Sequence, residues 1–258
     1  MEPVAIGQKI HYYKGLPSTQ DLAVSMAESD SLILNGTVVL AERQDNGRGR
    51  QNRRWVSPPG GLWLSIILKP TLHANRSTLI NFIAILAICE AIEAKTCLQC
   101  RVKWPNDILV NNKKVCGIIV DAAIKGNYIY YSVVGIGINV NVNIQTIIQY
   151  LEPDSKTGNS ITSLKAEQSG RYVNRRSLLQ NIFERLNYYI NSIERENASM
   201  RVLSNITHRL KGIGKTLIID RADCRTTGQF IGLCSEGSLV LSDSDGAIFK
   251  ILGQDISI

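Results

Sequence analysis

The stretch NGRGRQNRRW, residues 46–55, combines four arginines and two glycines with a terminal tryptophan. Guanidinium groups bind carboxylate and phosphate through paired N–H donors, and glycine lets the backbone take positive φ or approach a ligand closely. Three interpretations fit: a solvated basic loop, a nucleic-acid contact, or a clamp for phosphate or carboxylate. The stretch contains neither the Gly-Lys-Ser/Thr of a P-loop nor the G-x-G-x-x-G of a dinucleotide site. The arginines, rather than the glycine backbone, would therefore have to hold an anion.

A second group of chemically capable residues begins at KWPND, residues 103–107. Pro105 ends the run that precedes it, so the turn can present Asn106 and Asp107 at the end of a sheet. An Asx-capped turn is the plainer interpretation. Lys114 follows across an expected hairpin, either as an exposed turn residue or as a point charge directed at a phosphate in a cleft.

GIGIN, residues 135–139, ends an expected strand with two glycines and the amide of Asn139. Close approach of a ligand to the backbone is one interpretation, and a bulge or tight packing is the other. Trp55 also has two interpretations, because its indole can stack on a base or anchor the loop in the core.

The elements that must position these residues are those of an ordinary globular chain. It has 258 residues, of which 44% are hydrophobic and 20% charged, and a net charge of +7 that favours anionic partners without identifying one. Cys97 and Cys100 form a C-x-x-C without a second pair at zinc-like spacing, so we expect structural thiols. The most apolar run is too short for a membrane span and contains Glu90, and the start lacks the features of a signal peptide. We therefore expect a cytoplasmic protein without a membrane partner.

Hydrophobic periodicity predicts strands and helices in mixed order along the first two thirds of the chain. Polar, irregular residues follow at 150–176, then an amphipathic helix, and after residue 210 several short β-like runs separated by Gly, Asp and Ser. We expect strands at 9–13, 36–43, 62–70 and 128–142, helices from Ser18 or Thr19, at 77–94 and at 177–193, and a hairpin centred on residues 111–113. Two domains are predicted, a large one at 1–210 and a small β-barrel at 211–258.

Taken together and in this order, STQDLA, the 41–66 stretch around GRGR, KWPNDILVNNKKVCGIIVDA and GIGINVNV resemble the biotin protein ligase family. The resemblance spans about residues 10–142, and NSITSL at 159–164 matches a weaker family segment. It implies an α+β fold, with a mixed sheet and packed helices related to class II tRNA synthetases, followed by a small SH3-like β-barrel. No helix-turn-helix precedes STQDLA, so the resemblance points to a form without the DNA-binding domain of some relatives.

The resemblance also implies a reaction. Biotin and ATP give biotinyl-5′-AMP and pyrophosphate with the help of Mg²⁺, whose ligands on the protein are unknown. The biotinyl group then passes to one lysine of a biotin carboxyl carrier protein or domain. A possible homodimer follows from the same analogy, and no DNA partner is expected.

Site residues carry over position by position. The catalytic set is Lys114, Arg48, Arg50, Asn106 and Asp107. The biotin-binding set is Ser18, Thr19, Gln44, Gly47, Arg48, Arg50, Lys114, Gly117 and Gly135. The ATP-binding set is Arg50, Arg53, Trp55, Asn106, Lys114 and Asn139. The cations would neutralise charge that develops on the α-phosphoryl group.

The chain departs from the family pattern in two places. Gln51-Asn52 stand where many members have Arg-Gly, so loop closure is expected to differ. Cys116 and Asp121 replace a small residue and Glu, and we expect little effect from them. Two other functions compete with the first: a lipoate-type ligase or octanoyl transferase of the same superfamily, and a nucleic-acid-binding module suggested by the basic loop.

Overall fold

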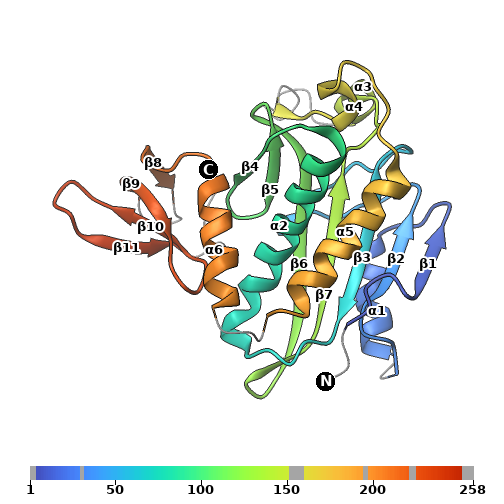
Figure 1. Cartoon of the computed structure of the whole chain (residues 1–258), viewed down its shortest axis with the longest axis horizontal. Helices are drawn as coiled ribbons and strands as arrows, with labels where there is room; N and C mark the ends of the chain where they lie inside the picture. The colour runs from blue at the N-terminus through green and yellow to red at the C-terminus, as the bar shows by residue number, and fades with distance from the viewer. Residues whose placement is uncertain (1–3, 30–31, 151–159, 194–196, 221–224, 252–258) are drawn as a thin grey trace.

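The computed structural model describes residues 4–29, 32–150, 160–193, 197–220 and 225–251 (Figure 1). In these residues a large sheet has the strand order β1-β2-β3-β7-β6-β5-β4. Its strands are β1 (Ile10–Tyr13), β2 (Thr37–Ala41), β3 (Leu62–Leu68), β4 (Cys100–Lys103), β5 (Asp107–Val110), β6 (Lys113–Lys125) and β7 (Tyr128–Ile138). β1 and β2 run parallel and the other neighbouring pairs antiparallel, so the sheet is mixed, as predicted.

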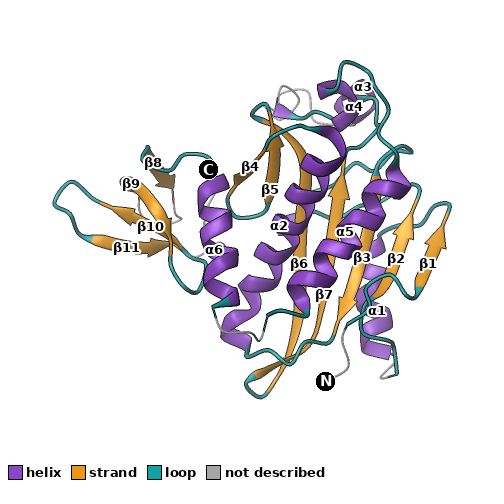
Figure 2. Cartoon of the chain, in the orientation of Figure 1, coloured by secondary structure: helices purple, strands orange, loops and turns teal. Residues whose placement is uncertain are grey.

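Helices cover both faces of this sheet (Figure 2). The helices are α1 (Thr19–Ser29), α2 (Ser77–Thr96), α3 (Ile144–Ile148), α4 (Leu164–Glu167), α5 (Arg175–Ile190) and α6 (Ala198–Arg209), with short 3-10 turns η1 (Arg50–Asn52) and η2 (Ala74–Arg76). In Figure 1, α2 and α5 lie in front of the sheet and α1 lies behind it. Alternation along β3 explains both contacts, because Leu64 and Ile66 join the core with α2 while Ile67 packs with α1.

Helix α2 is apolar nearly all round because it is buried in the middle of the fold. The helical stretch Ala74–Thr96 is long and apolar enough to cross a membrane by length and composition alone, and it is longer than the run expected from sequence. However, 67% of its most apolar window is buried inside the structure. Packing against the sheet, α5 and α6 therefore accounts for its composition.

A second sheet follows α6, with the strand order β11-β10-β9-β8. Its strands are β8 (Thr216–Asp220), β9 (Arg225–Leu233), β10 (Leu239–Ser242) and β11 (Ile248–Ile251), close to the predicted β runs. Phe230 and Leu239 from this sheet belong to the same hydrophobic cluster as α2. Trp104 Nε1 donates a hydrogen bond of 3.3 Å to the carbonyl of Gly237, so the second sheet contacts the turn that carries KWPND.

Three helices are absent from the sequence prediction. α4 lies in the stretch expected to be irregular, where Ser163 Oγ accepts from Ala166 N at 3.3 Å and starts the helix. α3 is likewise started by the Asn143 side chain. In α6 the buried residues are only Val202 and Ile206, so the apolar repeat that identifies a helix is brief. Residues 151–159 of the predicted irregular stretch lie outside the described part.

The cysteines agree with the structural interpretation as far as the structure describes them. Cys89, Cys97, Cys100, Cys116 and Cys234 are free thiols, and Cys224 lies outside the described residues. Burial raises the pKa of the Cys89 and Cys116 thiols well above their ordinary value. Neutral, buried thiols of this kind pack as small apolar side chains.

Candidate active site

The arginine-rich loop leaves the end of β2 and folds back over the sheet face that α1 also covers. Trp55 N donates to Gly47 O at 2.7 Å and Gly49 N to Arg53 O at 2.8 Å, so the loop closes on itself like a hairpin. A Cβ on Gly47 would lie 2.4 Å from Trp55 O, which makes a side chain impossible there without movement of the backbone. Glycine at position 47 therefore allows the tight loop, and the arginines of the loop lie over the sheet.

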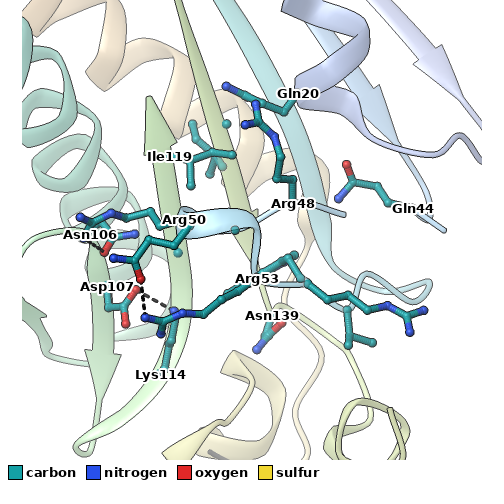
Figure 3. A pocket seen from close by; sticks show the side chains of 18 of the residues that line it. Gln20, Gln44, Arg48, Arg50, Arg53, Asn106, Asp107, Lys114, Ile119 and Asn139 are labelled. Atoms are coloured by element: carbon teal, nitrogen blue, oxygen red, sulfur yellow. Dashed lines mark hydrogen bonds and ion pairs between the residues drawn. The ribbon is translucent and has the colours of Figure 1, made fainter. Parts of the chain in front are cut away.

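A cavity of about 340 Å³ lies beneath this loop (Figure 3). Its walls come from the loop, the start of α1, β3, the KWPND turn, β6 and β7. The lining includes Thr19, Gln20, Gln44, Arg48, Arg50, Arg53, Trp55, Ser65, Asn106, Asp107, Lys114, Gly117, Ile119, Gly135, Asn139, Ile147 and Ile161. A cavity of this size, with apolar patches and converging polar groups, suits a small organic ligand.

Glycines form the floor of the cavity. Gly117 of β6 pairs directly with Gly137 of β7, and Gly135 lies two residues along the same face. The indole of Trp55 covers the pair, since a Cβ on Gly137 would lie 2.5 Å from Trp55 Nε1. A Cβ on Gly135 would lie 2.4 Å from Gln20 Oε1. The structure thus shows tight packing of side chains against these glycines, the second interpretation of GIGIN. Approach of a ligand to the backbone stays a prediction.

Polar groups gather at the end of the cavity nearest α1. Thr19 N donates to Gln44 Oε1 at 2.7 Å, and Gln44 Nε2 donates to Ser57 Oγ at 2.8 Å. Ser65 Oγ lies 2.9 Å from both Thr19 Oγ1 and Gln20 Oε1. These buried groups satisfy one another and so hold fixed orientations at this end of the cavity.

Lys114 and Asp107 form an ion pair at the other end, with Lys114 Nζ 2.7 Å from Asp107 Oδ1. The pairing follows from the hairpin, whose turn residues Asn111 and Asn112 take positive φ of 48° and 64°. Lys114 Nζ also lies 5.0 Å from the centre of the Trp55 ring. Lys114 therefore contributes a fixed positive charge to the cavity, not to an exposed turn.

Arg50 reaches the same end from the loop, and Figure 3 shows it beside Asn106. Its Nη1 lies 3.4 Å from Asn106 Oδ1, while Asn106 Nδ2 donates to Ile118 O at 2.7 Å. Burial lowers the pKa of Arg50, Asp107 raises it and Arg53 lowers it further. Burial is the largest of these effects, so the pKa of Arg50 lies below its ordinary value.

The segment after residue 160 supports two cavity residues from outside. Thr162 N donates to Lys114 O at 2.9 Å, and Leu164 N donates to Asn139 O at 2.9 Å. Asn139 Nδ2 donates to Thr162 O at 3.1 Å. Asn139 is only 2% exposed, and its Oδ1 has no hydrogen-bond partner among the described residues. A buried acceptor on a cavity wall is suited to a donor on a ligand.

Arg48 takes a different direction from Arg50. In Figure 3 it extends toward Gln20 and away from Lys114. It forms ion pairs with Asp121 and with Asp21, whose Oδ1 lies 3.1 Å from Arg48 Nε. Gln20 Nε2 donates to the same Asp121 oxygen at 3.0 Å. Arg48 thus joins the loop to β6 and to α1.

Among the residues that the structure describes, the cavity lining does not form a resident Mg²⁺ site. Asp107 is the only carboxylate in this described lining, and it is already paired with Lys114. The described residues contain no group of three His, Cys, Asp or Glu placed to hold a metal. Because Mg²⁺ requires several oxygen ligands, the ion would have to arrive with a substrate that supplies them.

Comparison with known proteins identifies the family. The model of the Biotin/lipoate A/B protein ligase family matches residues 14–139. A bifunctional ligase/repressor BirA of Bacillus spizizenii is 31% identical over 257 residues, which covers 98% of this chain and 75% of the relative. The chain belongs to the biotin protein ligase family.

Other members of the family agree with this result. A biotin–[acetyl-CoA-carboxylase] ligase of Paracoccus denitrificans is 37% identical over 101 residues, 38% of this chain and 42% of the relative. The solved structure of a biotin protein ligase from Aquifex aeolicus in complex with biotin and ATP is 26% identical. It aligns with a TM-score of 0.79 over 97% of this chain and 98% of that one. The predicted family resemblance is confirmed.

Most residues that the family resemblance selected meet in one cavity. Ser18 and Gly47 lie beside it: Ser18 is buried, and its Oγ accepts from Asp21 N at 3.2 Å at the start of α1. Gln20 and Ser65 line the cavity although the sequence analysis did not select them. Ser65 had a readable signal, because it is the single polar residue in the apolar strand LWLSIIL.

Proposed function

We propose that this protein is an ATP-dependent biotin protein ligase. The observation that carries the proposal is one cavity with a glycine floor, a fixed polar end beside Thr19 and Gln44, and a cationic end beside Lys114 and Arg50. A carboxylic acid with a polar head and an apolar chain fits a cavity that has one neutral polar end and one cationic end. Family membership supports biotin as that acid, because the similar protein of Paracoccus denitrificans is a biotin ligase and the similar Aquifex aeolicus structure holds biotin and ATP.

In the first step, a carboxylate oxygen of biotin attacks the α-phosphorus of ATP. The bond between that phosphorus and the oxygen bridging to the β-phosphate breaks, and pyrophosphate leaves with the electron pair. Both reactants are anions, so the step requires fixed positive charge at the point of contact. We assign this role to Lys114 and Arg50. Asp107 orients Lys114, and Asn106 positions Arg50.

ATP would bind at the end of the cavity formed by Trp55, Arg53 and Asn139. The unpartnered Oδ1 of Asn139 supports recognition of an adenine, whose exocyclic amine is a donor. Trp55 lies over Gly117 and Gly137 at half-burial, so its indole can offer a face or an N–H to the nucleotide. Mg²⁺ would enter as part of the MgATP substrate and bind phosphate oxygens.

In the second step, the amine of a lysine on a biotin carboxyl carrier domain attacks the carbonyl of the mixed anhydride. A C–N bond forms, the bond to the phosphate oxygen breaks, and AMP leaves. The nucleophile belongs to the carrier, so no covalent intermediate on this chain is required. Closure of the arginine loop over the adenylate would limit its loss to water.

The finer points of architecture belong to the same proposal. We expect a catalytic domain at 1–210 and an SH3-like domain at 211–258, related to class II synthetases in the first part. Support for the division comes from the separate strand order of the second sheet. A homodimer and a cytoplasmic location are expectations from the family analogy.

ATP–pyrophosphate exchange tests the reaction. Labelled pyrophosphate should enter ATP when biotin is added and not when lipoate or octanoate is added. Subsequent transfer should label a carrier domain, and a carrier with its target lysine changed to arginine is the matched control. Exchange driven by lipoate but not by biotin would show that the chain is instead a lipoate-type ligase.

A further inference from the structure

Arg48 stands at the centre of a polar chain that links three elements of the fold. Its guanidinium meets the carboxylates of Asp121 on β6 and Asp21 on α1. The Arg48 and Asp121 side chains are 31% and 37% exposed, whereas that of Asp21 is 61% exposed. Ion pairs that are partly sheltered are screened less than exposed ones. Asp121 is therefore the stronger partner.

The position of Asp121 is itself fixed by the buried groups around it. Gln20 Nε2 donates to Asp121 Oδ2 and to Val133 O, each at 3.0 Å. Gln20 is 2% exposed, and its Oε1 accepts from Ser65 Oγ at 2.9 Å. These hydrogen bonds consequently hold the Asp121 carboxylate at a fixed position on the sheet, where Arg48 binds it.

This contact matters for the loop because of where Arg48 lies within it. Gly47 and Gly49 flank Arg48 in the chain. Asn46 N donates to Pro17 O at 2.9 Å, and from Gly47 onward the backbone hydrogen bonds of the loop join its own residues, such as Gly49 N to Arg53 O at 2.8 Å. The Arg48 side chain instead crosses from the loop to β6 and α1 on the opposite wall (Figure 3). Arg48 lies opposite Arg54 at the base of the hairpin, so loss of that crossing would release the base of the loop from this wall, while Arg50 at the tip still contacts Asn106.

We propose that the carboxylates of Asp121 and Asp21 bind Arg48 and thereby hold the arginine loop closed over the cavity. We call this set of ion pairs the latch. Asp121, Asp21 and Arg48 are then positioning residues for adenylation, and the charge of Arg48 is used to hold the loop. This differs from the sequence-based assignment of Arg48 to the anion clamp. It also gives a role to Asp121, which the sequence analysis treated as a departure of little effect. The proposal rests on the adenylating function above.

The first experiment needs no catalysis. Limited trypsin digestion of the full ligand-free chain reports how readily the loop at residues 46–55 opens, because its arginines are cleavage sites. Asp121→Asn, which keeps the shape and removes the charge, should speed cleavage in the loop about tenfold, and Asp21→Asn should have a smaller effect. Asp45→Asn is the matched control, since Asp45 is exposed and pairs with Arg43 at 3.4 Å.

Thermal melting of each variant confirms that the comparison is made between folded proteins. Asp121→Glu, which restores the charge one methylene further out, should recover part of the protection. Equal loop cleavage in wild type and Asp121→Asn, with both proteins folded, would overturn the latch.

The second experiment separates a latch from a clamp. Under the latch, Arg48→Gln and Asp121→Asn produce the same change, a roughly tenfold faster release of biotinyl-AMP and a higher KM for biotin, with kcat for exchange altered much less. The double variant should be no worse than either single one. Higher salt should speed release from the wild type and change Asp121→Asn little.

If Arg48 acts directly on the phosphoryl group, the two variants must differ. Arg48→Gln would then lower kcat, while Asp121→Asn would leave kcat unchanged or raise it by freeing the arginine, and this outcome would overturn the proposal. Failure of the function itself is distinguishable, because the wild type would then show no biotin-dependent exchange at all. The proteolysis comparison would still report on the latch.

Discussion

At the scale of single residues, the ion pair between Lys114 and Asp107 determines what the cationic end of the cavity can do. Lys114 Nζ is held 2.7 Å from the Asp107 carboxylate, so the position of its positive charge is fixed before a ligand binds. Preorganised charge is more effective than charge that must move during the reaction. Arg50, partly desolvated beside Asn106, adds a guanidinium to the ammonium of Lys114 at the same end.

Replacement of Lys114 should therefore slow the first step much more than it weakens biotin binding. We expect Lys114→Ala to reduce biotin-dependent pyrophosphate exchange about 100-fold or more, while calorimetry with biotin alone still detects binding. Lys125→Ala, at the exposed far end of the same strand, is the control. A Lys114→Ala exchange rate equal to that of wild type would remove this lysine from the catalytic set.

Sequence predicted the chemical type of most cavity residues but not their directions. The four loop arginines have the same predicted chemistry, yet Arg48 meets two carboxylates and Arg50 faces Asn106. Gln51 shows the same limit of sequence reasoning. Its φ of 53° places positive φ at this residue, one position before the one where many relatives have glycine. Contacts made across the fold, not local composition, decide such features.

At the scale of elements, the segment from Ser160 to Glu167 braces the hairpin that carries Lys114. Glu167 accepts from Thr162 Oγ1 at 2.6 Å and from Asn111 Nδ2 at 2.7 Å, and Lys113 Nζ lies 3.5 Å away. Burial alone would raise the pKa of Glu167, but these hydrogen bonds and the lysine together hold it below its ordinary value. The brace consequently favours the ionised carboxylate.

A lowered pKa in the folded state has a definite consequence for stability. The contribution of Glu167 is fully present above the ordinary carboxyl pKa of about 4.3 and is lost as the pH falls through the lower folded value. Glu167→Gln should lower the free energy of unfolding by about 1–2 kcal/mol at pH 7. The deficit should shrink as the pH falls below about 4.

Urea unfolding at pH 7, 5 and 4 and at about pH 3 measures this dependence. Glu184→Gln, an exposed change on α5, is the matched control and should show little effect at any of these pH values. If Glu167→Gln lowered the free energy of unfolding by the same amount at every pH at which the protein is folded, an ionised Glu167 carboxylate would be contradicted.

Elements with long apolar runs or a helical repeat were predictable, and the bracing elements were not. The strands β2 and β3 and the helix α2 are long apolar runs, and α1 has apolar residues at helical spacing. The short helices α3 and α4 offer too few residues for a period to be visible. Their positions depend on distant contacts, such as the hydrogen bond from Leu164 N to Asn139 O, that no local pattern contains.

At the scale of the whole molecule, the second sheet contacts the part of the cavity wall that carries Asn106 and Asp107. Gly237 has φ +82°, and a Cβ there would lie 2.3 Å from Phe82 of α2. Its carbonyl accepts the hydrogen bond from Trp104, three residues before Asp107. A disturbance at Gly237 therefore reaches the KWPND turn through the packed core.

Two glycine substitutions separate this contact from backbone strain. Gly237→Ala and Gly246→Ala incur a similar cost of about 1–2 kcal/mol for positive φ, since Gly246 has φ +81° with nothing within 4 Å of its Cβ position. Overpacking against Phe82 should destabilise Gly237→Ala by about 1–3 kcal/mol more. Only this variant should also slow pyrophosphate exchange. Equal unfolding free energies for the two would show that the second sheet does not press on α2.

The buried central helix and the terminal β strands were predicted from the residues, because burial and turns leave a direct trace in composition. The mixed sheet was implied by the family resemblance. The packing of the second sheet against α2 and Trp104 was not, since it joins residues more than a hundred positions apart. The assembly of the cavity from α1, β6, β7 and the loop was inferred from the family resemblance alone. Spacing could not have supplied it, because these segments are separated by whole elements.

The glycine floor has a consequence for which acids can enter. Gly117 and Gly135 line the cavity at positions where other strand residues present side chains. A surface of peptide units has no rotamers, so it cannot yield to a larger ligand as a wall of leucines would. The depth of the cavity is fixed by the sheet itself. Selectivity between substrates of different ring size can therefore arise from rigid shape, independent of the charges that drive the reaction.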